Sequence, residues 1–187
     1  MLKGQKWWWY VVALGLFVAS LSSPLAVSRG KLLAFAWIWP ILIWSAMGTR
    51  EKRFQTNQLV FSAAHSIRHQ LPAMWLAGVM VAMAAGGGTA IRLLIAGQGQ
   101  ALVGWLVGAI FIPTMALACG TWSGSSKLFE ILYTVLWYVG PMQSTPQLDF
   151  MAVSPKTIEM AMPRIFLVVT LALIVLATVA RRRQLQT

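Results

Sequence analysis

Two histidines four residues apart form the most suggestive pair of metal ligands in this 187-residue sequence. His65 and His69 occupy positions i and i+4, a spacing that puts both imidazoles on one face of a helix, where they could hold a metal ion. No cysteine, aspartate or glutamate lies near them in the sequence to complete a coordination shell. Histidines on a polar helix face are more often simply solvated, so we expect neither a metal site nor a bound cofactor.

Acidic residues are scarce. The four in the chain are too few and too scattered to form a paired-carboxylate catalytic site. The glycine triplet at residues 86–88 follows no strand and lacks the Lys-Ser/Thr of a phosphate-binding loop. The sequence therefore offers candidates for neither acid–base catalysis nor nucleotide hydrolysis, and we expect no enzymatic activity.

The composition indicates an integral membrane protein. The chain is 58% hydrophobic and 10% charged and contains ten tryptophans, and several apolar runs approach the roughly 20 residues that cross a bilayer. A net charge of +11 could suggest nucleic acid, but the basic residues cluster at the ends of the apolar runs and not along one face. We therefore expect the chain to be surrounded by lipid and to bind no nucleic acid.

Six apolar runs predict an all-α, polytopic helical bundle of about six spans, in one transmembrane domain over residues 1–187. The fifth run has twelve residues, about 18 Å of helix against a hydrocarbon core of roughly 30 Å, so it either recruits residues 120–127 or stops partway. The expected crossings are residues 7–27, 32–47, 72–91, 101–119, 128–139 and 164–180.

Prolines and glycines predict where these helices break. Residues 28–31 indicate a tight turn between the first two runs, and Pro40 should kink the second. Pro72 suits the first position of the third helix, and the glycines at residues 86–88 should cause a bend or a close backbone approach.

The proline-rich residues 141–163 cannot form one continuous helix. We expect an outer loop with short helices, in which residues 148–153 dip into the membrane edge as one of them. Asp149 within this loop would cap a short helix or, as the less favoured alternative, gate an exit.

Basic residues predict the orientation. With six spans and the N-terminus inside, ten basic residues face the cytoplasm and five face outward. This bias favours both termini inside, in a multi-pass protein of the cell's inner (cytoplasmic) membrane.

Two residue pairs are candidates for interactions at or between helices. Gly104 and Gly108 have the small-residue spacing that lets helices pack closely in lipid, and we expect them to act within the fold. Lys127 and Glu130 are three residues apart, which predicts an ion pair near the inner surface. A Glu130 charge that faces a pathway inside the bundle is the alternative.

The longest internal hydrophilic segment, residues 48–71, predicts a cytoplasmic loop over residues 49–71 that ends in an amphipathic helix. Phe61 projects from the polar face of this helix, near His65, Arg68 and His69. An aromatic side chain placed there has no core to fill and suits a groove on a soluble partner. A helix that merely lies in the headgroup layer is the alternative.

Two parts of the sequence resemble bacterial type-2 ABC exporter permeases. Residues 120–143, GTWSGSSKLFEILYTVLWYVGPMQ, followed by LDFM at residues 148–151, resemble the C-terminal part of that family. MGTRE at residues 47–51 and QLVFSA at residues 58–63 are similar to its region between the second and third spans.

The resemblance implies six helices per half-transporter, cytoplasmic termini, and a coupling helix in the 49–71 loop that docks on a separate ATP-binding cassette ATPase. It also implies a second permease subunit, as a homo- or heterodimer. Related permeases can be longer, so the chain could be a half-size subunit or the C-terminal part of a longer one. The alternative function is a non-catalytic structural subunit of a multi-subunit membrane complex.

Overall fold

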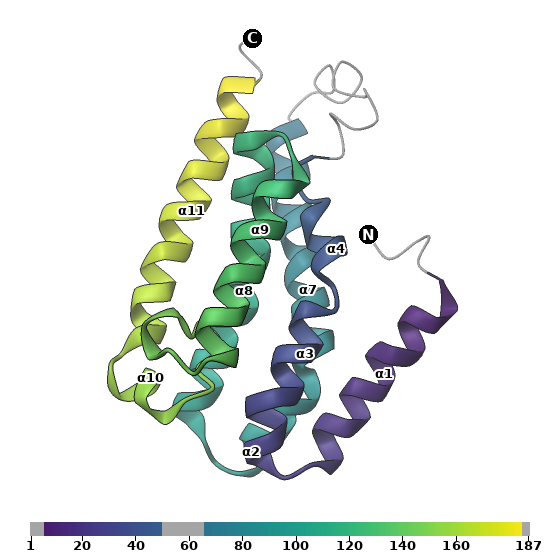
Figure 1. Ribbon diagram of the computed structural model, residues 1–187. Coiled ribbons are helices and arrows are strands. Elements are labelled where there is room, and N and C mark those ends of the chain that lie inside the picture. Colours follow the sequence, from purple (N-terminus) through teal and green to yellow (C-terminus); the bar gives the residue numbers. More distant parts are fainter. Residues whose placement is uncertain (1–5, 50–65, 185–187) are drawn as a thin grey trace.

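The structure is a computed structural model that describes residues 6–49 and 66–184, with only the backbone of residues 66–69 and 184. Every regular element in these ranges is a helix (Figure 1). The long helices are α1 (Trp7–Ser22), α7 (Ser66–Ile95), α8 (Gly99–Ser123), α9 (Ser126–Trp137) and α11 (Met162–Gln184). Three segments, Gln70–Ile95, Gly99–Ser123 and Met162–Arg183, are long and apolar enough to cross a membrane, and Trp7–Ser22 is a shorter apolar helix. The described chain is thus all-helical and compatible with a membrane-embedded protein.

The break after the first helix lies earlier than expected. Pro24 has no backbone N–H and an extended backbone (φ −54°, ψ 145°), and α1 ends just before it. The chain then stays helical through α2 (Leu25–Val27), a π-helical turn (Ser28–Leu32) and α3 (Leu33–Ile38). The predicted tight turn at residues 28–31 is therefore wrong, because these polar residues are accommodated inside a helix.

Pro40 interrupts the second helical segment as predicted. It separates α3 from α4 (Ile41–Ser45), and its own backbone (φ −83°, ψ 15°) departs from helical values. Since proline cannot donate the backbone hydrogen bond of a helix interior, the helix is interrupted at this point.

Helix α7 is continuous over 30 residues, and Pro72 lies inside it. The expectation that Pro72 opens the helix is therefore wrong. It stands in the second turn, where its missing N–H frees one carbonyl close to the helix end. The glycine triplet also leaves α7 unbroken and instead permits a close approach. A methyl group on Gly88 would lie 2.7 Å from the carbonyl oxygen of Phe17 in α1.

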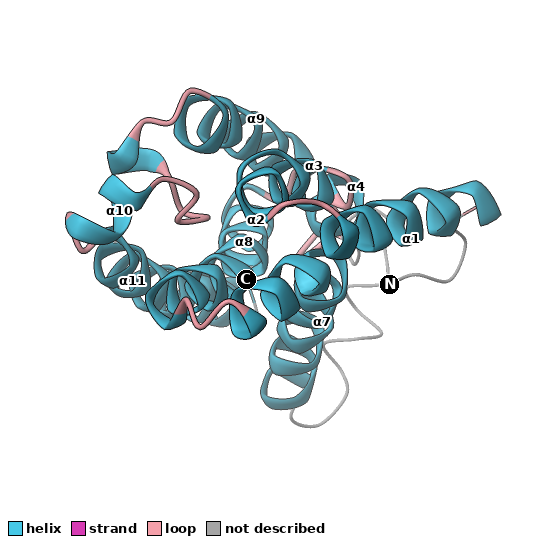
Figure 2. Cartoon of the chain, turned by 90° about the horizontal axis from the view of Figure 1, so that it is seen from below, coloured by secondary structure: helices cyan, strands magenta, loops and turns pink. Residues whose placement is uncertain are grey.

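Helix α8 is the central element of the bundle. It packs against α7, α9 and α11, and in the view from below these helices and α3 surround it (Figure 2). Seventeen of its residues are buried, and the helix passes through Pro113 without ending. An apolar helix that is buried around most of its circumference is typical of a bundle core.

The fifth apolar run corresponds to α9 and a π-helical turn (Tyr138–Met142). Residues 120–123 complete α8 and do not extend α9, because Gly124 adopts the left-handed conformation (φ 66°) that ends α8. The fifth run thus gains length at its C-terminal end, through Val139, Gly140 and Pro141.

Residues 143–161, which we call the return segment, double back toward the bundle between α9 and α11. The segment contains a 3-10 turn (Pro146–Leu148) and α10 (Pro155–Glu159). Phe150, Met151 and Ala152 are buried, but they are not helical. The predicted short helix over residues 148–153 is therefore wrong, although its inner residues do enter the core.

The bundle has two distinct ends (Figure 1). The end of α4, the start of α7, the α8–α9 turn and the C-terminal end of α11 lie together at the upper end. Helix α2, the α7–α8 turn and α10 lie at the lower end. Helix α1 leans away from the rest at its N-terminal end.

Candidate functional site

A polar pocket of about 620 Å³ lies at the upper end of the bundle. We call it the α4–α9 pocket. One wall comes from α4 and the turn after it, and the other from the α8–α9 turn and the first turn of α9. The lining residues are Leu42, Ser45, Ala46, Thr49, Gly124, Ser126, Lys127 and Glu130. Three hydroxyls, one amine and one carboxylate therefore converge on one opening.

Local structure places the two charges of this pocket. Ser125 has an extended backbone and accepts a hydrogen bond from the Lys127 N–H at 3.2 Å, so it caps the start of α9. Lys127 and Glu130 then lie on one helix face, and Lys127 Nζ donates to Glu130 Oε2 at 2.8 Å. The predicted partners thus form an ion pair, and the same carboxylate faces a cavity.

The pair is asymmetric in exposure. The Lys127 side chain is 76% exposed and the Glu130 side chain is 22% exposed. Ser126 and Ser45 line the pocket together with Glu130. Glu130 therefore lies in the pocket wall, whereas Lys127 reaches it from the solvent side.

Gly104 and Gly108 face the return segment. A methyl group on Gly104 would collide with the Cβ of Ala152, and one on Gly108 would lie 2.6 Å from the Phe150 carbonyl oxygen and 2.8 Å from Trp37 Cζ3. The small residues therefore make room within this chain for a non-helical segment and an indole ring, where we had expected the flank of a neighbouring helix.

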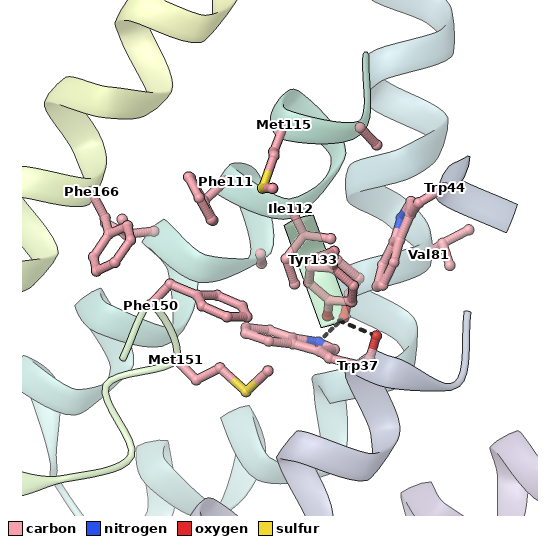
Figure 3. Packing of buried hydrophobic residues seen from close by; sticks show 14 of the residues in the cluster. Trp37, Trp44, Val81, Phe111, Ile112, Met115, Tyr133, Phe150, Met151 and Phe166 are labelled. Carbon is pink, nitrogen blue, oxygen red and sulfur yellow. Dashed lines mark hydrogen bonds between the residues drawn. The ribbon is translucent and has the colours of Figure 1, made fainter. Parts of the chain in front are cut away.

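Phe150 brings the return segment into the aromatic core. Its ring lies 5.5 Å from Phe111, 5.9 Å from Tyr133 and 6.3 Å from Phe166, between centroids. Figure 3 shows these rings together with Trp37, whose carbonyl accepts a 3.0 Å hydrogen bond from the Tyr133 hydroxyl. The core thus joins α3, α8, α9 and α11 to the return segment.

A buried carboxylate organises the return segment. Asp149 is 1% exposed and accepts hydrogen bonds from the Met151 N–H at 3.2 Å, the Ser154 N–H at 2.9 Å and the Thr157 hydroxyl at 2.8 Å. It thereby holds the turn before α10, which is close to the capping role expected of it. Ala152, inside this turn, has a positive φ of 51°, a strained value for a residue with a side chain.

Arg29 ties the return segment to the first half of the chain, a role that the sequence did not suggest. Its Nε donates to the Ala152 carbonyl at 2.9 Å and its Nη2 donates to the same oxygen, while Nη1 reaches Gln98 Oε1 at 3.4 Å. The guanidinium also interacts electrostatically with Asp149. The only available signal was its place in a polar tetrad, which we interpreted as a turn.

The coupling-helix residues fall largely outside this description. Phe61 and His65 lie outside the described residues, and of Arg68 and His69 only the backbone is described, in the first turn of α7. Among the described side chains, no group of three or more histidine, cysteine, aspartate or glutamate residues lies close enough to hold a metal ion.

Comparisons of the whole chain with protein-family models, with curated proteins and with solved structures give no match.

Proposed function

We propose that this protein is the membrane-spanning permease subunit of an ABC-type exporter. A separate ATP-binding cassette ATPase would dock on residues 49–71, and a second permease subunit would complete the transporter. The proposal includes six crossings with both termini in the cytoplasm, of which α1, the α2–α4 segment and α9 would supply the three shorter ones.

The observation that carries the proposal is the grouping of elements at the upper end of the bundle. The chain leaves α4 and enters α7 there, next to the α8–α9 turn and the arginines that end α11. Arg181 Nη2 donates to Gln70 Oε1 at 3.2 Å, which joins the C-terminal helix to the beginning of α7. A partner that held residues 49–71 would therefore meet both helices flanking that loop and also α11.

The return segment supports the proposal from the other end. It follows the fifth apolar run and folds against the core at the end opposite the end of α4 and the start of α7, where the resemblance to exporter permeases implies short outer helices. In the proposed cycle, ATP binding closes the ATPase dimer, the coupling helices move, and α4 and α7 transmit that movement to the outer end, where substrate leaves.

The test is an ATPase pull-down from membranes with equal permease levels. Phe61→Ala should weaken the association about thirtyfold, the loss of an interfacial hot-spot aromatic, and Arg68→Ala should weaken it as well. Val60→Ala, on the apolar face of the amphipathic helix predicted from the sequence, is the matched control and should retain the partner. If both Phe61→Ala and Arg68→Ala retain the ATPase at wild-type strength, or if none associates with the native protein, the proposal is wrong.

A structural subunit of a larger membrane complex is the second candidate, favoured by exposed aromatic side chains. Trp7 is 77% exposed, Trp8 47% and Trp122 61%. Tryptophans also anchor helices at the headgroup level, which accounts for them equally well in a permease. Stable co-purifying partners without a nucleotide-binding fold would favour this second function.

A further inference from the structure

The α4–α9 pocket combines a polar interior with an apolar rim. Its volume of about 620 Å³ is within the range of small-molecule sites, roughly 300–1,000 Å³. Ser45, Thr49 and Glu130 supply the interior, and Leu42, 70% exposed, supplies part of the rim. The end of α4 and the α8–α9 turn, which form the pocket, lie at the upper end of the bundle (Figure 1), where a bilayer's headgroups would meet the proposed spans. A ligand with a polar head and an apolar tail suits such a site.

The two charges of the pocket differ in how firmly they are held. The Glu130 side chain is only 22% exposed and lies in the pocket wall with Ser45 and Ser126, so its carboxylate remains in the pocket when the lysine amine leaves. Lys127 reaches it through a long side chain that is 76% exposed. An exposed ion pair of this kind contributes little stability, so another cation can replace the lysine amine at small cost.

We propose that the α4–α9 pocket binds a phosphoethanolamine headgroup, with the ligand's primary ammonium on Glu130 and its phosphate on Lys127. One exposed ion pair is thereby exchanged for two charge-assisted contacts. A phosphoglycerol headgroup offers no cation to Glu130. A choline headgroup offers a cation without N–H donors, so it cannot reproduce the hydrogen bond that Lys127 makes. This inference goes beyond the proposed transport function, and its test uses the purified protein without an ATPase.

The neighbouring helix surface suits the acyl chains of a phospholipid. From the pocket along α9, Ile131 is 63% exposed and Val135 57% exposed, and Leu42 lies on the α4 side. These apolar side chains follow the headgroup site along the direction in which lipid tails run. The site therefore fits a membrane phospholipid better than a free headgroup compound.

The experiment measures lipid retained by delipidated, detergent-purified full-length protein, by native mass spectrometry. Phosphatidylethanolamine, phosphatidylglycerol and phosphatidylcholine with identical acyl chains are offered separately, together with soluble glycerophosphoethanolamine. We expect wild-type protein to prefer phosphatidylethanolamine over phosphatidylglycerol by about tenfold, the effect of one charge-assisted hydrogen bond.

Variants assign that preference to the pocket. Glu130→Gln keeps the shape of the side chain but removes its charge, and should abolish the preference. Lys127→Gln should weaken retention of all phospholipids at this site. Glu159→Gln removes an exposed carboxylate at the opposite end of the bundle and, as the matched control, should behave as wild type.

Two results would overturn the proposal. One is equal retention of phosphatidylethanolamine and phosphatidylglycerol by the wild-type protein. This result does not depend on the folding of any variant. The other is an undiminished preference in Glu130→Gln. If glycerophosphoethanolamine saturates the pocket at the same concentration as the lipid, the headgroup chemistry is supported and the ligand is a soluble phosphoethanolamine compound.

Discussion

Gly108 of α8 lies so close to Phe150 of the return segment that a methyl group at Gly108 would stand 2.6 Å from the Phe150 carbonyl oxygen. Real Cβ atoms do not approach a backbone oxygen so closely, and Trp37 blocks the other direction at 2.8 Å. The contact belongs to backbone and to a fully buried indole, neither of which moves easily in a packed core.

Gly108→Ala should therefore destabilise the protein by about 1–3 kcal/mol, the usual cost of overpacking a core. Thermal unfolding in detergent measures the change. Gly15→Ala is the matched control, because Gly15 lies within α1 with nothing within 4 Å of its added Cβ, and alanine there should stabilise the helix by about 0.5–1 kcal/mol. An alanine at Gly108 that melts like wild type would contradict the close packing of the return segment.

Asp149→Asn should loosen the return segment. The amide can keep one acceptor oxygen, but its NH2 group must then face the backbone N–H of Met151 or of Ser154, with a cost of about 1–3 kcal/mol for an unsatisfied buried donor. Proteolysis within residues 143–161 measures the loosening. Thr157→Val, which removes one of the three donors, should have a smaller effect. If both variants resist proteolysis as well as the wild-type protein, the carboxylate does not organise the segment.

Arg29→Gln should also loosen the return segment, although Arg29 is far from that segment in the sequence. Without the guanidinium, the Ala152 carbonyl loses its donors and the return segment loses its link to the first half of the chain. Increased proteolysis of residues 143–161 is the expected result. Lys31→Gln is the control, since Lys31 is exposed in the same π-helical turn.

Glu130→Gln tests the two roles considered for this carboxylate. Because its partner Lys127 is 76% exposed, the ion pair should contribute at most about 1 kcal/mol to the free energy of unfolding, and transport should continue. A double-mutant cycle with Lys127→Gln isolates the pair's own contribution. Loss of transport at normal membrane levels of the protein would instead assign Glu130 to the transport pathway.

Cysteine labelling tests the six crossings. In a chain with Cys119 replaced, single cysteines at Lys31, Gly97 and Thr145 should react with an impermeant reagent outside the cell, while those at Thr56 and Gln186 should not. Lys31 is preferred to its neighbour Ser28, which is fully buried and hydrogen-bonded to Thr89 at 3.1 Å. Labelling of a cysteine at Gln186 from outside would contradict the prediction of a sixth crossing.

Helix positions were predictable where apolar runs are long and their ends are marked by polar residues. The fourth run, expected over residues 101–119, became Gly99–Ser123, and the sixth, expected over residues 164–180, became Met162–Gln184. Burial of apolar side chains and the internal pairing of backbone groups both favour helices there, so the local pattern and the fold agree.

Polar positions were harder to predict, because distant residues determine their structure. The residues 28–31 have the composition of a turn, but Thr89 and Ala152 provide hydrogen-bond partners that keep them helical. The partners of Arg29, Gln98 and Ala152, lie 69 and 123 residues away, and the α4–α9 pocket joins segments about 80 residues apart. No local spacing contains such information.

The length of α7 has a mechanical consequence. Thirty residues of α-helix extend about 45 Å, whereas the hydrocarbon core of a bilayer is roughly 30 Å thick. A helix of this length that crosses with little tilt extends beyond the hydrocarbon core by a turn or more. Pro72 does not interrupt the helix between its first turns and the part that crosses the core. A continuous helix of this kind links the first turn at Ser66 to Gly88, where α7 packs closely against α1.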